Sequence, residues 1–225
     1  MSQINKIRDD FDQIALISSH DEWDHNYHYH KFLLNRMPSN CVNAMDIGCG
    51  KGVFTKLMSE RSEHVLALDL SPNMIQIARN QSKGYNNISY EIADVMSWNF
   101  PKEEFDCITS IATLHHLPFD EILVKMKDAL KYNGVLMVLD LYKFVWKKDI
   151  PVNIIAMPAN IVLKMLKNKR LRDTKESKAI WDAHFANDYL LPLSYIRKVC
   201  ASILPGASVK RHLFWRYSII WTKKK

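Results

Sequence analysis

The residues best suited to chemistry in this sequence are a run of glycines between two acids. The segment DIGCGKG (46–52) places glycines at alternate positions, and a residue without a Cβ lets the backbone approach a ligand closely. Asp69 follows 21 residues after Gly48, where a carboxylate can accept hydrogen bonds from the two hydroxyls of a ribose. The pattern indicates a binding site for a nucleoside cofactor.

Two cofactors suit such a site, and the third glycine distinguishes them. A dinucleotide site favours GxGxxG, so that the pyrophosphate rests on a helix N-terminus, but position 53 is valine and the third glycine is Gly52. Asp46, two residues before the first glycine, suits a cationic ammonium group held directly or through water; alternatively, it caps amides at a strand end. The motif favours S-adenosylmethionine over NAD, which leaves a nicotinamide-dependent oxidoreductase as the rival enzyme.

Alternating strands and helices are expected to position this motif. Apolar runs predict five buried strands, and apolar residues at helical spacing predict three helices between them. The strands are 41–48, 64–71, 88–95, 105–114 and 135–142, and the helices are 53–61, 72–81 and 120–131. Ser71 is the expected N-cap ahead of Pro72, and Asn133-Gly134 is the expected stop of the third helix. This alternation predicts a parallel sheet with helices on both faces.

The C-terminal part departs from the alternation. We expect a helix over 191–204 and two strands over 207–214 and 217–224, joined by a short turn at 215–216. So short a connection predicts that these last strands pair antiparallel.

Five sequence blocks carry a family resemblance. They are MDIGCGKG (45–52), ALDLSPNMIQIAR (67–79), IADV (92–95), FDCITSIATLHHL (105–117) and LKYNGVLMVLDLY (130–142). Together they resemble the class I S-adenosylmethionine-dependent methyltransferases of small-molecule type, with a motif set like that of the ubiquinone and menaquinone methyltransferases. The resemblance implies a Rossmann-like, doubly wound α/β fold with a seven-stranded, mostly parallel sheet and one antiparallel strand. It also implies S-adenosylmethionine as cofactor and S-adenosylhomocysteine as product.

The same resemblance assigns cofactor roles to individual positions. Gly48, Cys49 and Gly50 would line the methionine part, near Asp46. Asp69 would hold the ribose, with Leu70 and Met74 beside it. The remaining cofactor residues are Asp94 on the adenine amino group, Val95 against the ring and Ile111 near the sulfonium.

Methyl transfer to a hydroxyl or an acidic carbon is helped by a base, and several histidines could serve. They are His115 and His116 after the fourth strand, His184 in the insertion, and His28 and His30 near the N-terminus. Of these, His116 and His184 are the predicted catalytic residues. The alternative for the paired His115-His116 is a loop-packing role. His25, His28 and His30 are not spaced for metal binding together with a carboxylate or cysteine, so no metal site is expected.

Two helical segments are expected to border the site. An N-terminal lid over 1–40 would close on the cofactor with Tyr29 and His30, and Tyr27 is a further candidate; the alternative is an amphipathic helix packed on the sheet edge. A helical insertion over 143–190 would cover the acceptor, with apolar residues lining the pocket: Trp146, Met157, Met165, Trp181 and Phe185. Its basic second half leaves peripheral membrane contact as an alternative to a solvated surface.

Composition limits the remaining possibilities. The chain has 225 residues, a net charge of +7 and 48% hydrophobic residues, which is ordinary for one folded domain and argues against disorder. We predict a single domain with a cofactor-binding core over 41–142 and a last helix and strands over 191–225. Four separated cysteines predict reduced thiols and a cytoplasmic location.

The expected partner is a small-molecule methyl acceptor, aromatic or amphipathic, rather than nucleic acid. The loop after the fourth strand lacks the proline-rich tetrapeptide of nucleic-acid amino methyltransferases. Oxygen is the favoured acceptor atom, with carbon or nitrogen as alternatives. A non-catalytic S-adenosylmethionine-binding partner protein is the rival from another class, and the chain is expected to be a monomer or a dimer.

Overall fold

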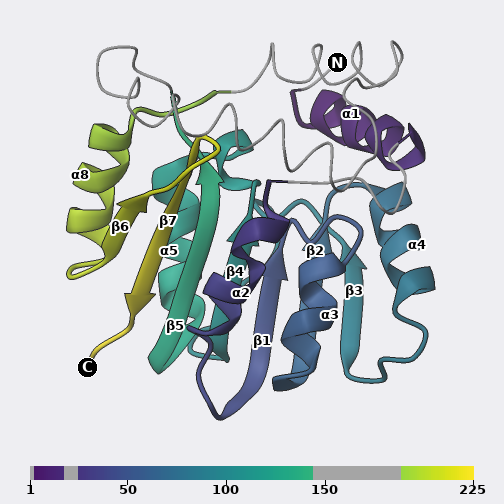
Figure 1. Ribbon diagram of the computed structural model, residues 1–225, viewed down its shortest axis with the longest axis horizontal. Helices are drawn as coiled ribbons and strands as arrows, with labels where there is room; N and C mark the ends of the chain where they lie inside the picture. Colours follow the sequence, from purple (N-terminus) through teal and green to yellow (C-terminus); the bar gives the residue numbers. More distant parts are fainter. Residues whose placement is uncertain (1–2, 18–24, 144–188) are drawn as a thin grey trace.

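The computed structural model describes residues 3–17, 25–143 and 189–225, and its centre is one seven-stranded sheet in the order β3-β2-β1-β4-β5-β7-β6 (Figure 1). Strands β1 to β5 run parallel, whereas β7 is antiparallel to β5 and to β6. The strands are β1 (Cys41–Ile47), β2 (Ser62–Asp69), β3 (Ile88–Ile92), β4 (Phe105–Ile111), β5 (Leu130–Leu141), β6 (Ser208–Arg211) and β7 (Arg216–Thr222). The predicted Rossmann-like, mostly parallel sheet is confirmed.

Helices cover both faces of the sheet, because its central strands are apolar on both sides. One face packs on α5 (Phe119–Ala129) and α8 (Leu193–Ile203), through buried residues such as Met45 and Ile47 of β1. The other face packs on α2 (His30–Leu34) and α3 (Val53–Ser59), where Ala44 meets the cluster of Phe54 and Met58. This arrangement leaves the carboxyl ends of β1 to β5 together at one edge, called the carboxyl edge below.

Local signals in the sequence explain where α4 (Pro72–Gln81) begins. The Ser71 hydroxyl accepts a hydrogen bond from Met74 N at 3.1 Å, and Pro72 occupies the first turn. Ser71 is therefore the N-cap, as predicted.

The boundary between α5 and β5 differs from the prediction. The helix ends at Ala129, and β5 begins at Leu130 rather than at residue 135. Leu130 pairs with Phe105, and the register then shifts before the next pair, Cys107 with Val135. Asn133, at φ 67°, takes up this irregularity within the strand, so Asn133-Gly134 bends a strand instead of stopping a helix.

The N-terminal segment forms α1 (Gln3–Ile17) and the short 3-10 helix η1 (Tyr27–Tyr29) ahead of α2. Helix α1 lies beside α4 over the carboxyl edge, as Figure 1 shows. There Ile14 and Ala15 are buried against Met74. Within the expected N-terminal lid, α1 lies at this edge, and so does Asn26, which accepts a hydrogen bond from Arg216 of β7.

Two other expectations concern the C-terminal half. The turn between β6 and β7 spans His212 to Trp215, and Arg216 already belongs to β7. The insertion expected over 143–190 falls almost wholly outside the described residues. In the described part of the chain no helix is long and apolar enough to cross a membrane.

Candidate active site

The glycine loop between β1 and α3 contains three glycines with positive φ, Gly48, Gly50 and Gly52. A Cβ at Gly48 would collide with the Thr113 side chain, and one at Gly52 would lie 2.5 Å from the Tyr90 hydroxyl. A Cβ at Gly50 would meet nothing within 4 Å. Gly48 and Gly52 are thus required by packing, whereas Gly50 borders open space that a ligand can fill.

Asp69 closes this loop onto the end of β2. Its Oδ2 accepts a hydrogen bond from Gly50 N at 2.8 Å, and its Oδ1 accepts one from Ser71 N at 2.9 Å. Burial raises the pKa of Asp69, and the nearby Asp12 charge adds to that rise. Because each carboxylate oxygen has two lone pairs, both can still accept from a ribose hydroxyl.

Asp46 lies on β1, just before the glycine loop, and is buried. Its Oδ2 accepts from the Thr55 hydroxyl at 2.6 Å, and its Oδ1 accepts from the Thr109 hydroxyl at 3.0 Å. Burial raises the pKa of Asp46 to about 6, although the hydrogen bonds from the two threonines lower it in part. The donors to Asp46 in the structure are two threonine hydroxyls, not amides at a strand end. Its contact with an ammonium group stays a prediction.

Because the pKa of Asp46 is raised, we expect the free energy of unfolding to depend on pH. An aspartate in the unfolded chain has a pKa of about 4. Between pH values of about 4 and 6 the folded chain therefore binds more protons than the unfolded chain does, and the free energy of unfolding falls as the pH rises. Asp46→Asn should remove the part of this fall that Asp46 causes, and should leave the chain at pH 7.5 at least as stable as wild type. Urea unfolding at several pH values measures the difference. A parallel decline in both proteins would contradict the assignment.

The other predicted cofactor residues lie along the carboxyl edge. The amides of Gly48 and Cys49 donate to Leu68 O, which holds the loop against β2. Leu70 precedes the N-cap of α4, and Met74 is buried in its first turn. After β3, Asp94 Oδ1 accepts from Met96 N at 2.9 Å, while Val95 is buried. Ile111 ends β4. The structure brings this set to one edge; contact of each member with a cofactor stays a prediction.

Tyr29 and His30 have defined packing partners. The Tyr29 hydroxyl donates to Leu213 O at 2.9 Å, and burial raises its pKa to about 12. The His30 ring lies 5.0 Å from the Phe54 ring. Both residues fasten η1 and α2 to the β6–β7 turn and to α3, and their contact with a cofactor is untested.

Two residues of α1 belong to the site's surroundings but were not predicted. The Asp12 carboxylate accepts from the Ser71 hydroxyl through a short hydrogen bond, and from Asn73 N at 3.1 Å. The Phe11 ring meets the His116 ring edge-on at 5.4 Å. Sequence shows only a polar helix with several acids here; it does not reveal which acid reaches the N-terminus of α4.

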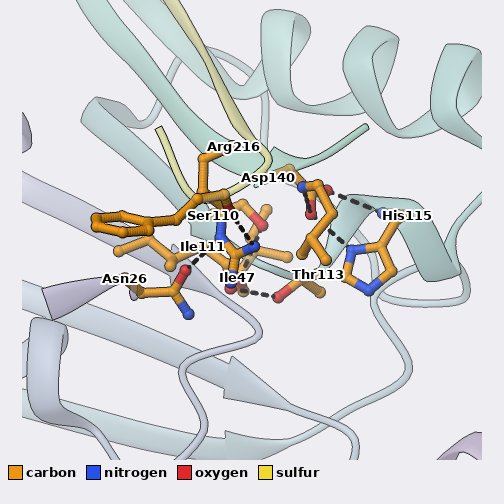
Figure 2. Close-up of polar contacts among 10 residues, drawn as sticks. Asn26, Ile47, Ser110, Ile111, Thr113, His115, Asp140 and Arg216 are labelled. Carbon is orange, nitrogen blue, oxygen red and sulfur yellow. Dashed lines mark hydrogen bonds and ion pairs between the residues drawn. The ribbon is translucent and has the colours of Figure 1, made fainter. Parts of the chain in front are cut away.

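A buried polar pair lies at the ends of β4 and β5 (Figure 2). His115 Nδ1 is 2.6 Å from Asp140 Oδ1, and His115 N donates to Asp140 Oδ2 at 2.9 Å. The His116 ring packs against the His115 ring at 3.9 Å between centroids. His184, the other candidate base, lies outside the described residues. Among the described residues no cluster of His, Cys, Asp and Glu could hold a metal ion.

A buried arginine lies on the neighbouring strand at the same edge. Arg216 Nε donates to Asn26 Oδ1 at 2.8 Å, and its Nη1 donates to Phe214 O at 3.2 Å (Figure 2). It ties the segment before η1 to the start of β7. This residue, too, has no counterpart among the predicted site residues.

Comparison with known proteins agrees with this geometry. Residues 44–134 match the family described as methyltransferase domain. An uncharacterized methyltransferase of Mycobacterium tuberculosis is 23% identical over 202 residues, which cover 88% of this chain and 96% of that protein. The ubiquinone biosynthesis O-methyltransferase of Coxiella burnetii is 26% identical over 101 residues, 44% of this chain and 43% of that one.

A solved structure extends the likeness over the whole chain. The N-methyltransferase NodS from Bradyrhizobium japonicum, in complex with S-adenosylhomocysteine, has a TM-score of 0.64 at 14% identity and covers 100% of both chains. At that identity it shows the fold. Together with the family match over residues 44–134 and the glycine loop, this fold supports a class I S-adenosylmethionine-dependent methyltransferase.

Proposed function

We propose that this enzyme transfers the methyl group of S-adenosylmethionine to a small-molecule acceptor, with a hydroxyl oxygen as the first acceptor atom to test. The observation that carries the proposal is the open space at Gly50, whose amide donates a hydrogen bond to the Asp69 carboxylate. Such a site admits a ligand against bare backbone and offers its ribose a pair of acceptor oxygens.

The part of the protein in the reaction is to hold the cofactor and to orient the acceptor. S-adenosylmethionine would supply a methyl group on a sulfonium, and S-adenosylhomocysteine would leave as the acceptor bonds to the methyl carbon in line. Asp69 would hold the ribose, Asp94 and Val95 the adenine, and the loop at Gly48 and Gly50 the methionine part. Placing an acceptor atom about 3 Å from the methyl group accounts for most of the catalysis that such a reaction needs.

Oxygen is proposed first because a ubiquinone biosynthesis O-methyltransferase is among the relatives. Nitrogen is the second candidate, since NodS is named an N-methyltransferase. The bound acceptor would lie beyond Ile111, over the ends of β4 and β5. An acceptor screen should therefore pair hydroxyl compounds, such as catechol and caffeate, with amines of similar size.

Calorimetric titration with S-adenosylmethionine, S-adenosylhomocysteine and NADH tests the cofactor first. We expect micromolar binding of the first two and none of NADH. Binding of NADH alone would overturn the proposal. With the cofactor established, release of S-adenosylhomocysteine in the acceptor screen separates a catalyst from a cofactor-binding partner protein.

Asp12 gives a more specific prediction about cofactor affinity. Its contacts with Ser71 and Asn73 hold α1 against α4, where Ile14 and Ala15 pack on Met74. Asp12→Asn weakens hydrogen bonds to a charged acceptor and should raise the Kd for S-adenosylmethionine about three- to tenfold. Calorimetry provides the Kd, and hydrogen exchange should show faster exchange of the α1 amides.

Asp9→Asn is the matched control for Asp12. Asp9 lies on the same helix, and its carboxylate is 3.1 Å from Arg8 Nη2. This variant removes the same charge without touching α4. An equal loss of affinity in both variants would mean that only the charge of α1 matters.

A further inference from the structure

We propose that a cavity at the amino ends of β1, β2 and β4 is a second binding site, and that its ligand is a small aromatic amine. This amino-edge cavity has a volume of about 390 Å³. It lies at the edge of the sheet opposite to the carboxyl edge (Figure 1). The residues that line it include Asn43, His64, Leu66, Trp98, Glu104 and Phe105.

The cavity exists because no helix covers this part of the sheet. Residues 93–104, which connect β3 to β4, all belong to the described part of the chain and contain no helix, although such a crossover usually contains one. Leu66 is therefore only partly buried, whereas Met45, its partner on β1, and Leu68, the next residue on the same face, are buried. The open part of Leu66 is apolar surface that a ligand can cover.

Trp98 is held in place before any ligand arrives. Its Nε1 donates to Glu91 Oε2 at 3.3 Å, and its ring meets the Phe100 ring edge-on at 5.0 Å between centroids. A side chain that is already ordered loses little entropy on binding. Together with Leu66 and the buried Phe105, Trp98 gives the cavity an apolar and partly aromatic lining. Such a lining favours an aromatic ligand, because pairs of rings attract each other beyond the effect of buried area.

The polar groups at the cavity offer hydrogen-bond acceptors and a negative charge. Asn43 Nδ2 donates to Glu104 Oε1 at 2.8 Å and to Glu104 O at 3.4 Å, so the donors of this amide are directed at Glu104. The acceptors at this place are then Asn43 Oδ1 and the Glu104 carboxylate, and the His64 imidazole adds a donor or an acceptor. A ligand with an amino group complements this set in both charge and hydrogen bonding.

The size and the place of the cavity define the ligand further. Sites for small molecules have volumes of about 300–1,000 Å³, and the lower end of this range suits one or two rings. Along β1, the five residues from Asn43 to Gly48 span about 16 Å, so a ligand here does not reach the glycine loop. The second site is thus separate from the cofactor and acceptor, and does not depend on the proposed function.

NMR titration of the whole chain with tryptamine tests the site, since tryptamine has both a fused aromatic ring and an amine. It should shift the Trp98 indole N–H and the amides of Leu66 and Glu104, with a Kd of about 1 mM or tighter for a ligand of this size. The amides of Gly50 and Ile111 report on the carboxyl edge. Indole-3-propionate has the same ring with a carboxylate, and should bind at least about fivefold more weakly because Glu104 repels it.

Two variants and a matched control assign the binding to the cavity. Glu104→Gln removes the charge but keeps an oxygen for Asn43, and should raise the Kd for tryptamine about two- to fivefold. Leu66→Phe fills part of the cavity and should raise it at least about tenfold. Glu103→Gln removes a charge that is paired with Lys223 at 3.3 Å, and should leave the Kd unchanged. Thermal unfolding shows whether each variant is folded.

Absence of shifts at Trp98, Leu66 and Glu104 with about 10 mM tryptamine would overturn the proposal. Shifts confined to Gly50 and Ile111 would also overturn it, because they would place tryptamine at the carboxyl edge. Equal affinity for indole-3-propionate would overturn the assigned class of ligand, as would an equal effect of the substitutions at Glu104 and its neighbour.

S-adenosylhomocysteine separates this site from the proposed function. Saturation of the protein with it should leave the Kd for tryptamine unchanged, and competition between the two would overturn the proposal. If S-adenosylhomocysteine does not bind at all, the proposed function fails, whereas the titration with tryptamine still decides whether the amino-edge cavity binds an aromatic amine.

Discussion

Gly50→Val should abolish measurable binding of S-adenosylmethionine, which means a Kd raised at least about 100-fold. The valine side chain would occupy the space beside the loop that is open in the structure. That space lies beside the amide that donates to Asp69 Oδ2, the carboxylate that is expected to hold the ribose. Calorimetry measures the affinity, and thermal unfolding shows that the variant is folded.

Gly206→Val is the matched control, because a valine is strained at a positive φ wherever it lies. Gly206 has φ 83° and Gly50 has φ 52°, and neither has an atom within 4 Å of an added Cβ. Gly206 lies in the turn after α8, away from the carboxyl edge. Both variants should lose about 1–2 kcal/mol of stability, but only Gly50→Val should lose cofactor affinity. Equal affinities in the two variants would contradict the site.

The regular elements of the core were predictable because local chemistry agrees there with tertiary packing. Pro72 and the Ser71 cap define the start of α4, and apolar runs define β1 and β2. The prediction that Asn133-Gly134 ends a helix was wrong, because Asn-Gly is equally typical of a helix end and of an irregularity within a strand. Only the pairing of Leu130 with Phe105 shows which of them forms.

The site was predictable where the chain is continuous and not where it is assembled from distant segments. Only α3 and β2 lie between the glycine loop and Asp69, so the spacing along the chain indicates that the two come together. Asp12 and Ser71 are 59 residues apart in the chain, and no periodicity relates them. The side chains of the adjacent residues His115 and His116 point in different directions. The His115 ring contacts Asp140 and the His116 ring packs on the His115 ring, and the sequence does not show which ring does which.

Asp69→Ala should raise the Kd for S-adenosylmethionine about several hundredfold. The substitution removes two expected hydrogen bonds to ribose hydroxyls, and bonds to a charged acceptor contribute about 1.5–3 kcal/mol each. It also frees the amides of Gly50 and Ser71, so the loop and the start of α4 lose their common anchor. Affinity should fall as the pH is lowered through the raised pKa of Asp69, because the protonated acid accepts fewer hydrogen bonds.

Asp106→Ala separates loss of affinity from general loss of structure. Asp106 lies near the amino end of β4, where Oδ2 accepts from Val42 N at 3.1 Å and from Asn43 N at 2.8 Å. Like Asp69, it joins two backbone amides to a strand end, but at the opposite edge of the sheet. Each variant should be destabilised, and only Asp69→Ala should lose cofactor affinity. If Asp106→Ala weakened binding as much, the effect of Asp69 would be one of stability, and the ribose would have to be held by another group.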